Sequence, residues 1–275
     1  MIDESRFAEG KVALITGSSR GIGRALSLAL ADRGSSVVVN YRRNEDLAAE
    51  VVREVHERGG EAIAVEADVE DPEQIDRLFD AAGERFGRVD YFVSNAAATA
   101  FKPILDFQQH HLDRSYAMNV RAFVLGTQRA VELMQDGGRI VAVSSYGSLH
   151  VYPTYAALGS AKAALEAWVR YMAMELAHRG VNVNAVNGGI IESDSSDFFY
   201  GVDGMAPIEN VLPKIPKQRM GSVAEVADAI RYLLEPRSEY ITGQTLVVDG
   251  GLTIIVPPFL HETSPPLRPP ELDEA

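Results

Sequence analysis

The sequence contains no cysteine, no long apolar run, and only 26 lysines and arginines against 39 acidic residues. The absence of cysteine excludes disulfides, thiolate catalysis and cysteine metal sites, so redox chemistry would need a bound cofactor. The formal net charge of -13 disfavours general affinity for nucleic acid, which needs clustered Lys and Arg. No apolar stretch reaches the roughly 18–20 residues that cross a bilayer. We expect a cytoplasmic protein that binds neither nucleic acid nor membrane.

Length and composition are those of an ordinary globular protein. The chain has 275 residues, of which 46% are hydrophobic and 24% charged, and this favours one α/β domain of roughly 250 residues. We place the domain at residues 1–256. The segment 257–275 is rich in proline and is expected to be an extended tail. The six histidines show no spacing typical of metal ligands, so no metal is expected.

Short apolar runs alternate along the chain with longer segments of helical period. The runs are apolar throughout, which is typical of parallel strands buried on both faces. The pattern predicts a doubly wound parallel sheet of about seven strands with helices on both faces. The segment 188–221 is too long for an ordinary connection and is expected to be a substrate lid. The expected helices span residues 22–33, 44–58, 72–86, 106–135, 153–178 and 222–234.

A glycine-rich loop follows the first apolar run in "ALITGSSRGIGRAL" and opens the first expected helix. Gly17, Gly21 and Gly23 would let the backbone turn sharply and approach phosphate oxygens, while the helix N-terminus favours negative charge. A strand before the loop and a helix after it predict a dinucleotide-binding Rossmann fold. The same loop contributes Ser19, Arg20 and Ile22 to the expected cofactor site.

The second apolar run ends in "NYRRN", with no acidic residue before Glu45. A site that prefers NAD usually has a carboxylate here for the adenosine ribose. Arg42 or Arg43, beside Tyr41 and together with Arg20, could instead pair with a 2′-phosphate, because a guanidinium matches phosphate geometry. We therefore expect NADPH as the cofactor. The alternative is that these arginines are solvated surface charges.

Several motifs resemble those of the short-chain dehydrogenase/reductase superfamily from Lys11 to Gly251. They are "TGSSRGIG", "AD" and "V" at 67–69, "SNAA" at 94–97, "MNV" at 118–120, "SS" at 144–145, Lys162 and "VVDGG". The resemblance implies that Lys162 holds the nicotinamide ribose and that Asn119 supports a water relay. It also implies further cofactor contacts at Asp68, Val69, Asn95, Gly188, Ile190 and Ser193, with Ser193 at the nicotinamide carboxamide.

One departure from the superfamily pattern concerns the catalytic tyrosine, because Leu158 stands four residues before Lys162. The spacing of a Tyr, six residues and then a Lys resembles that of the enoyl-thioester reductases of fatty acid synthesis, including NADPH-dependent enoyl-[acyl-carrier-protein] reductases. This resemblance assigns the phenol to Tyr155. On a helix, positions seven apart lie two turns apart on nearly the same face. The phenol would move roughly 4.5 Å along the axis, which suits a substrate whose charge gathers away from the carbon that accepts hydride.

Three functions are compatible with these residues. The first is reduction of an enoyl thioester, in fatty acid or polyketide type metabolism, with Tyr155 on the enolate oxygen. The second is reduction of a carbonyl, since Ser145 has the spacing of the serine used by carbonyl-reducing members. Tyr146 nearly matches a second tyrosine of some enoyl reductases. The third is a protein that binds NADP without catalysis.

The expected partners are an acyl thioester and other copies of the chain. Lys214, Lys217 and Arg219 form a local basic patch that could dock an acyl carrier protein or the phosphates of coenzyme A, although a solvated charge run is the alternative. The resemblance implies a homotetramer or dimer built through the helices expected at 106–135 and 153–178.

Overall fold

The structure is a computed structural model that describes residues 6–135, 137–193, 196, 199–200 and 207–254. The expected tail at 257–275 lies outside the described residues, as do parts of the segment 188–221. The assignment of that segment as a substrate lid stays a prediction.

Seven parallel strands form one sheet in the order β3-β2-β1-β4-β5-β6-β7. This order confirms the predicted doubly wound Rossmann fold. The chain reverses its direction of travel across the sheet between β1 and β4, where such sheets bind ligands at the carboxyl ends of the strands. The strands are β1 Val12–Ile15, β2 Ser36–Tyr41, β3 Ala62–Glu66, β4 Tyr91–Ser94, β5 Gly138–Ser145, β6 Val181–Gly188 and β7 Thr245–Val248.

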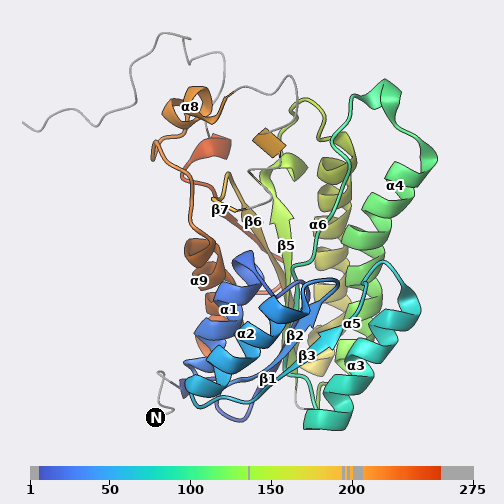
Figure 1. Ribbon diagram of the computed structural model, residues 1–275, viewed down its shortest axis with the longest axis vertical. Helices are drawn as coiled ribbons and strands as arrows, with labels where there is room; N and C mark the ends of the chain where they lie inside the picture. Colours follow the sequence, from blue (N-terminus) through green and yellow to red (C-terminus); the bar gives the residue numbers. More distant parts are fainter. Residues whose placement is uncertain (1–5, 136, 194–195, 197–198, 201–206, 255–275) are drawn as a thin grey trace, which may run out of the picture.

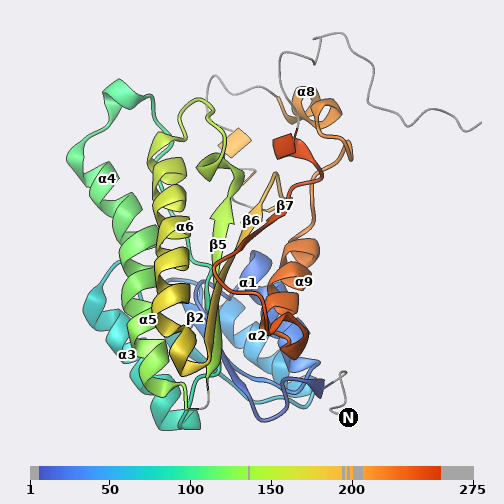
Figure 2. The same ribbon diagram turned by 180° about the vertical axis from the view of Figure 1, so that it is seen from behind.

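Helices cover both faces of this sheet (Figure 1). One face carries α1 Gly21–Ala31, α2 Glu45–Glu57 and α9 Val223–Leu234. The other carries α3 Pro72–Phe86, α4 Gln109–Tyr116, α5 Ala122–Leu133 and α6 Ala156–Leu176, as the reverse view in Figure 2 also shows. The short helix α8 Ile208–Val211 lies beyond the carboxyl ends of the strands. No described helix is both long and apolar enough to span a membrane.

Strand β1 is apolar at every position because its side chains enter two separate cores. In β1, Val12 and Leu14 pack into the core under α3, α5 and α6. Ala13 and Ile15 point the other way, into the core under α1, α2 and α9. Successive side chains of a strand face opposite sides of a sheet, so burial of both faces leaves no polar alternation. The same constraint explains why the strands could be recognised in the sequence.

The segment expected as a helix near 106–135 is helical from Gln109 to Leu133, but it is not α-helical throughout. A five-residue π-helix, Ala117–Arg121, separates α4 from α5. Within it, Nδ2 of Asn119 donates to the carbonyl oxygen of Ser115 (2.8 Å) and to that of Ala98 (3.1 Å). These bonds engage a backbone carbonyl of α4 with a side chain, and such short π segments often mark functional positions. Hydrophobic periodicity does not register a change of this size.

The helix expected at 153–178 begins later than predicted. Thr154 has a φ of 64°, in the left-handed region that a right-handed helix cannot contain. Tyr155 is therefore the N-cap residue, and α6 begins at Ala156. The expectation that Tyr155 and Lys162 share one helix was wrong by this single residue, and the phenol belongs to the loop before the helix.

Candidate active site

A cleft of about 1080 Å³ opens at the carboxyl ends of the strands, where β1 and β4 diverge. It exceeds the 300–1,000 Å³ or so of ordinary small-molecule pockets and suits an elongated ligand. No group of three or more described His, Asp or Glu side chains is placed to hold a metal ion. The lining comes mainly from the loops after five strands, at residues 19–22, 41–44, 95–99, 143–146 and 189–193.

The glycine loop occupies one end of the cleft and has the geometry that a pyrophosphate requires. Gly21 adopts a φ of 57°, which disfavours any side chain. A Cβ at Gly23 would lie 2.7 Å from the carbonyl oxygen of Gly17 and 2.8 Å from Nδ2 of Asn95, so only glycine fits. Arg20, the N-cap residue of α1, makes no side-chain cap bond, so no side-chain cap from Arg20 engages the first N–H groups of α1. The residues present therefore fit a bound dinucleotide.

Polar side chains hold this loop in place, and the sequence reasoning named Asn95 among them but missed Thr16 and Asn40. Oγ1 of Thr16 accepts from the backbone N–H of Asn95 (3.0 Å), and Nδ2 of Asn95 donates to the carbonyl oxygens of Thr16 (2.9 Å) and Gly17 (3.1 Å). Asn40, at the end of β2, accepts from the N–H of Gly17 (3.0 Å) and donates to Ala67 (3.0 Å). A polar residue inside an apolar strand was the available signal for Asn40.

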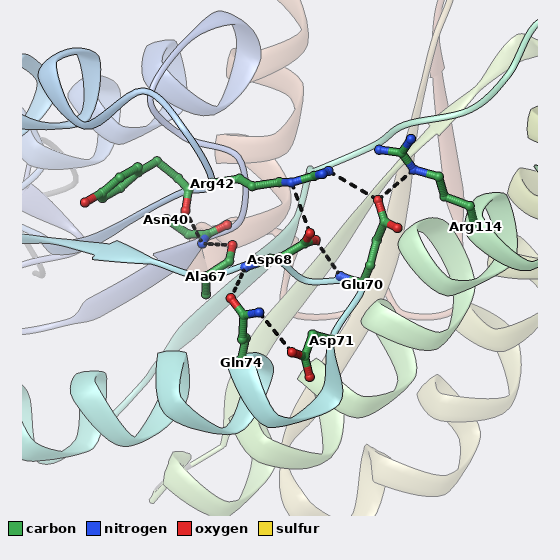
Figure 3. A network of polar contacts seen from close by, with 9 residues as sticks. Asn40, Arg42, Ala67, Asp68, Glu70, Asp71, Gln74 and Arg114 are labelled. Atoms are coloured by element: carbon green, nitrogen blue, oxygen red, sulfur yellow. Dashed lines mark hydrogen bonds and ion pairs between the residues drawn. The ribbon is translucent and has the colours of Figure 1, made fainter.

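The two arginines after β2, Arg42 and Arg43, differ in their surroundings. Arg42 pairs with Asp68 (Nε to Oδ2, 3.0 Å) and with Glu70 (3.3 Å), and Glu70 also pairs with Arg114 of α4 (2.9 Å) (Figure 3). Arg43 is exposed at the cleft, and no described carboxylate forms an ion pair with it. Two carboxylates already compensate Arg42, so Arg43 is the cation better placed to accept a phosphate.

Not every residue of the expected cofactor site lines the cleft. Asp68 engages Arg42, and Val69 is buried in the core beside it. Gly23 is buried in α1, and Gly188 ends β6 behind the cleft wall, whereas the adjacent Gly189 lines the cleft. The remaining expected contacts with the cofactor line the cleft: Gly17, Ser19, Arg20, Gly21, Ile22, Tyr41, Arg42, Arg43, Asn95, Lys162, Ile190 and Ser193.

The phenol of Tyr155 lies within the cleft beside Ser145. The two hydroxyl oxygens are 2.9 Å apart, and the ring stacks on Phe101 with centroids 5.5 Å apart. Burial raises the pKa of the Tyr155 phenol, so that it remains protonated and able to donate a hydrogen bond at neutral pH. Leu158 lines the same cleft with an apolar side chain. It stands four residues before Lys162, where the superfamily pattern has tyrosine.

Lys162 lies below Tyr155 on α6 and is buried. Its Nζ donates to the carbonyl oxygen of Val143 at the end of β5 (2.7 Å). Burial lowers the pKa of Lys162 to about 8, while the charge of Glu166 acts in the opposite direction. The ammonium group is thus mostly charged at neutral pH, although its proton is held less firmly than that of a solvated lysine.

Aromatic side chains form one wall of the cleft around Tyr155. Tyr152 lies with its ring centroid 4.3 Å from that of Tyr155 and stacks on Tyr146 at 4.8 Å. Phe199 meets Phe101 edge to face at 4.9 Å. Such a wall presents ring faces and edges to an apolar ligand. Phe198 and Met205, in the segment 188–221 expected as a substrate lid, lie outside the described residues.

Asn119 is buried behind the cleft and does not line it. Its Nδ2 is engaged by backbone carbonyls, and its Oδ1 has no partner among the described residues. An acceptor in this state is suited to a water molecule. The expected water relay through Asn119 stays a prediction.

Comparisons with known proteins agree on the kind of site. A family model described as "Enoyl-(Acyl carrier protein) reductase" matches residues 17–253. The chain is 62% identical over 260 residues to a 1-cyclohexenylcarbonyl-CoA reductase of Streptomyces collinus, which covers 94% of this chain and 93% of that protein.

Solved structures with the same architecture include a short-chain dehydrogenase/reductase from Serratia marcescens, with a TM-score of 0.84 and 31% identity over 90% of this chain and 99% of that one. A blue fluorescent protein from a metagenomic library, in complex with NADPH, has a TM-score of 0.84 and 30% identity over 90% and 99% of the two chains.

The buried state of Lys162 predicts a pH dependence of stability in the protein without cofactor. The folded pKa lies near 8 and the unfolded one near 10.4. Between these values only the unfolded chain keeps the proton, so the free energy of unfolding rises with pH by up to about 3 kcal/mol. We expect this rise to be missing in Lys162→Met. Urea unfolding at pH 7.5, 9 and 10 measures the difference, and parallel curves for the two proteins would contradict it.

Proposed function

Because the chain belongs to the short-chain dehydrogenase/reductase superfamily, we propose that it is an NADPH-dependent reductase that saturates the double bond of an enoyl thioester, with coenzyme A as the thiol. The observation that carries this proposal is the position of Tyr155. Its phenol lies in the cleft next to Ser145, seven residues before Lys162, while Leu158 fills the place of the usual tyrosine. The 62% identity to a CoA-thioester reductase supports the same reaction.

When bound, NADPH supplies the hydride that attacks the β-carbon of the enoyl group. Tyr155 donates a hydrogen bond to the thioester oxygen, on which negative charge gathers as the β-carbon accepts hydride, and the enolate then takes a proton from water at its α-carbon. Lys162 holds the ribose hydroxyls and places a positive charge below the phenol. Ser145 holds the phenol in its orientation through the 2.9 Å contact. The glycine loop at α1 holds the pyrophosphate.

The position of Tyr155 outside α6 favours an alkene over a ketone. In a ketone the carbon that accepts hydride bears the oxygen itself, so the proton donor and the hydride must meet at one group. In an enoyl thioester they act on separated atoms. The Tyr155 phenol lies before α6, three residues earlier than the tyrosine position of the superfamily pattern, which is Leu158 here. It would therefore reach the thioester oxygen rather than the carbon that accepts hydride. Ser145 favours the alternative, because it has the spacing of the serine used in carbonyl reduction.

The aromatic wall suits a cyclic acyl group. Tyr152, Phe101 and Phe199 present flat surfaces around Tyr155, and an alicyclic ring packs well against aromatic faces. The Streptomyces collinus relative is named for a cyclohexenyl acyl-CoA. An alicyclic enoyl-CoA is therefore the preferred substrate in this proposal.

The thioester end of the substrate would lie toward the basic patch. Arg219 makes a two-pronged ion pair with Glu225, with contacts of 2.9 and 2.6 Å, and is engaged with α9. Lys214 and Lys217 are exposed nearby. Their charge would attract the phosphates of coenzyme A, or the acidic surface of a carrier protein. A role in fatty acid type metabolism and a cytoplasmic location belong to the same proposal.

The proposed assembly is a homotetramer or dimer formed through α4 and α6. Trp168, Tyr171 and Met174 are exposed on α6 at 42%, 64% and 68%, whereas Met172 is buried in the core. Leu112 and Tyr116 are exposed on α4. Large apolar side chains on two adjacent helices are typical of a surface that another copy covers.

The substrate experiment compares 1-cyclohexenylcarbonyl-CoA, crotonyl-CoA and acetoacetyl-CoA, with NADPH oxidation followed by absorbance. We expect both enoyl thioesters to be reduced, because Tyr155 is displaced toward the enolate oxygen. The cyclic one should have the higher kcat/KM, because its ring packs against the aromatic wall. Product mass spectrometry confirms which bond is reduced. Oxidation of NADPH with acetoacetyl-CoA alone would overturn the proposal in favour of a carbonyl reductase.

Replacement of the phenol tests its role directly. We expect Tyr155→Phe to lower kcat for the enoyl substrate about 10²–10³-fold, the loss typical of a donor to a developing oxyanion, and Lys162→Ala to abolish turnover. Tyr152→Phe is the matched control, since it removes the hydroxyl of a neighbouring ring and should retain hydride transfer. Single-turnover rates measure each effect. Wild-type rates in Tyr155→Phe would contradict this role and mean that another group donates to the oxyanion.

The choice between NADPH and NADH depends on the arginines after β2. We expect Arg43→Ala to weaken NADPH binding about 10–100-fold, as for loss of a hydrogen bond to a charged group, and to leave NADH binding nearly unchanged. Arg42→Ala should have the smaller effect, because Asp68 and Glu70 already engage that side chain. Fluorescence titration with both cofactors measures the ratio. Equal losses for both cofactors would mean that Arg43 does not contact the 2′-phosphate.

A further inference from the structure

Glu166 is a buried acid that the proposed mechanism does not use. It lies on α6 one turn after Lys162, and only 7% of its surface is exposed. Residues four apart lie on the same face of a helix, so the carboxylate and the ammonium group share one side of α6. A buried charge is costly unless it is paired and hydrogen-bonded, so this position needs an explanation.

Three side chains from three different elements donate to one oxygen of Glu166. Oε1 accepts from Ser144 Oγ at the end of β5 (2.5 Å) and from Ser148 Oγ in the 3-10 turn Tyr146–Ser148 (2.7 Å). It also accepts from Nδ2 of Asn187 in β6 (3.0 Å). All three partners act as donors, which is the arrangement that an ionised carboxylate requires. The site therefore holds a negative charge directly below the floor of the cleft.

The negative charge acts on Lys162 through space. Nζ of Lys162 is engaged by the carbonyl oxygen of Val143, and Oε1 of Glu166 is occupied by its three donors. Lys162 is 3% exposed, so little water screens the two charges from each other. Burial draws the pKa of the lysine down to about 8, and the charge of Glu166 resists this fall.

The other titratable groups on the elements packed against α6 do not take this role. Burial raises the pKa of each of the three tyrosines nearest Lys162, so they stay neutral at physiological pH. On α4, Arg114 pairs with Glu70. The remaining groups are exposed or lie far along their elements: His110, His111, Asp113 and Arg121 toward α4 and α5, Arg139 at the start of β5, Arg170 and Glu175 on the outer face of α6, and His178 and Arg179 beyond its end.

We infer that Glu166 is a positioning residue: a buried counter-charge that keeps the Lys162 ammonium group protonated in the cleft. Its three hydrogen-bond donors hold the carboxylate in place and also tie the ends of β5 and β6 to α6. Without this charge, Lys162 would lose its proton at physiological pH more readily and its positive charge would be missing below the phenol. The inference goes beyond the proposed reaction and applies to the protein without cofactor.

The test is a direct titration of Lys162 by NMR in cofactor-free protein carrying ¹³C-labelled lysine. The lysine ε-methylene signal follows the protonation of Nζ, and Lys162→Ala identifies the signal. Lys11, Lys102, Lys214 and Lys217 serve as internal references. We expect a midpoint near 8 in the wild type. In Glu166→Gln the midpoint should fall by about one pH unit or more, as for loss of a nearby opposite charge.

Glu175→Gln is the matched control, because it removes the same charge from the exposed side of α6 and should leave the midpoint of Lys162 unchanged. An unchanged midpoint in folded Glu166→Gln would overturn the inference. Equal shifts in both variants would also overturn it, since they would reflect only net charge. Failure of the proposed reaction would not alter these titrations, so the two proposals are tested separately.

If Glu166→Gln fails to fold, a double variant decides the question. If Glu166 serves chiefly as a counter-charge, Lys162→Met/Glu166→Gln should fold, with a higher Tm than Glu166→Gln, because both buried charges are gone. If the carboxylate serves only to tie β5 and β6 to α6, the double variant should be as unstable as Glu166→Gln. Circular dichroism melts of the variants distinguish the two outcomes, and the second would overturn the inference.

Discussion

The hydrogen bonds between Asn95 and the pair Thr16 and Gly17 hold together the two strand ends between which the cleft opens. At this point the loops after β1 and β4 lead to helices on opposite faces of the sheet. The amide of Asn95 and the hydroxyl of Thr16 join the two loops, and Gly23 lies close against Asn95. The cofactor end of the cleft and the catalytic end are therefore parts of one rigid floor.

The fold could be predicted because burial on both faces of the sheet requires runs of apolar residues in the strands. Every residue of β1 is apolar since Leu14 and Ile15 enter different cores. The glycine loop could also be predicted from the sequence. Gly21 has a positive φ that disfavours a side chain, and Gly23 leaves no room for a Cβ. The same local logic did not reveal the π-helix around Asn119, where the change in hydrogen-bond register comes from contacts made across the fold.

The site was harder to predict than the fold, because its properties depend on neighbours distant in sequence. Arg42 appears in the sequence as a free cation after β2, yet Asp68 and Glu70 of the next connection engage it. Glu166 appears as one more helix charge, although its three donors come from β5, β6 and the turn between β5 and α6. Spacing along the chain identifies Tyr155 and Lys162, but only the packed structure shows what surrounds them.

The left-handed Thr154 separates the preceding loop from Tyr155, the N-cap residue of the helix that carries the lysine. Lys162 is fixed by α6 and by Val143, and the carbonyl oxygen of Tyr155 accepts from the N–H of Gly159 in the first turn of the same helix (2.8 Å). Insertions or replacements in the loop before Thr154 can thus reshape the cleft while the phenol and the ammonium group keep their spacing. One scaffold can in this way be adapted to acyl groups of different shape.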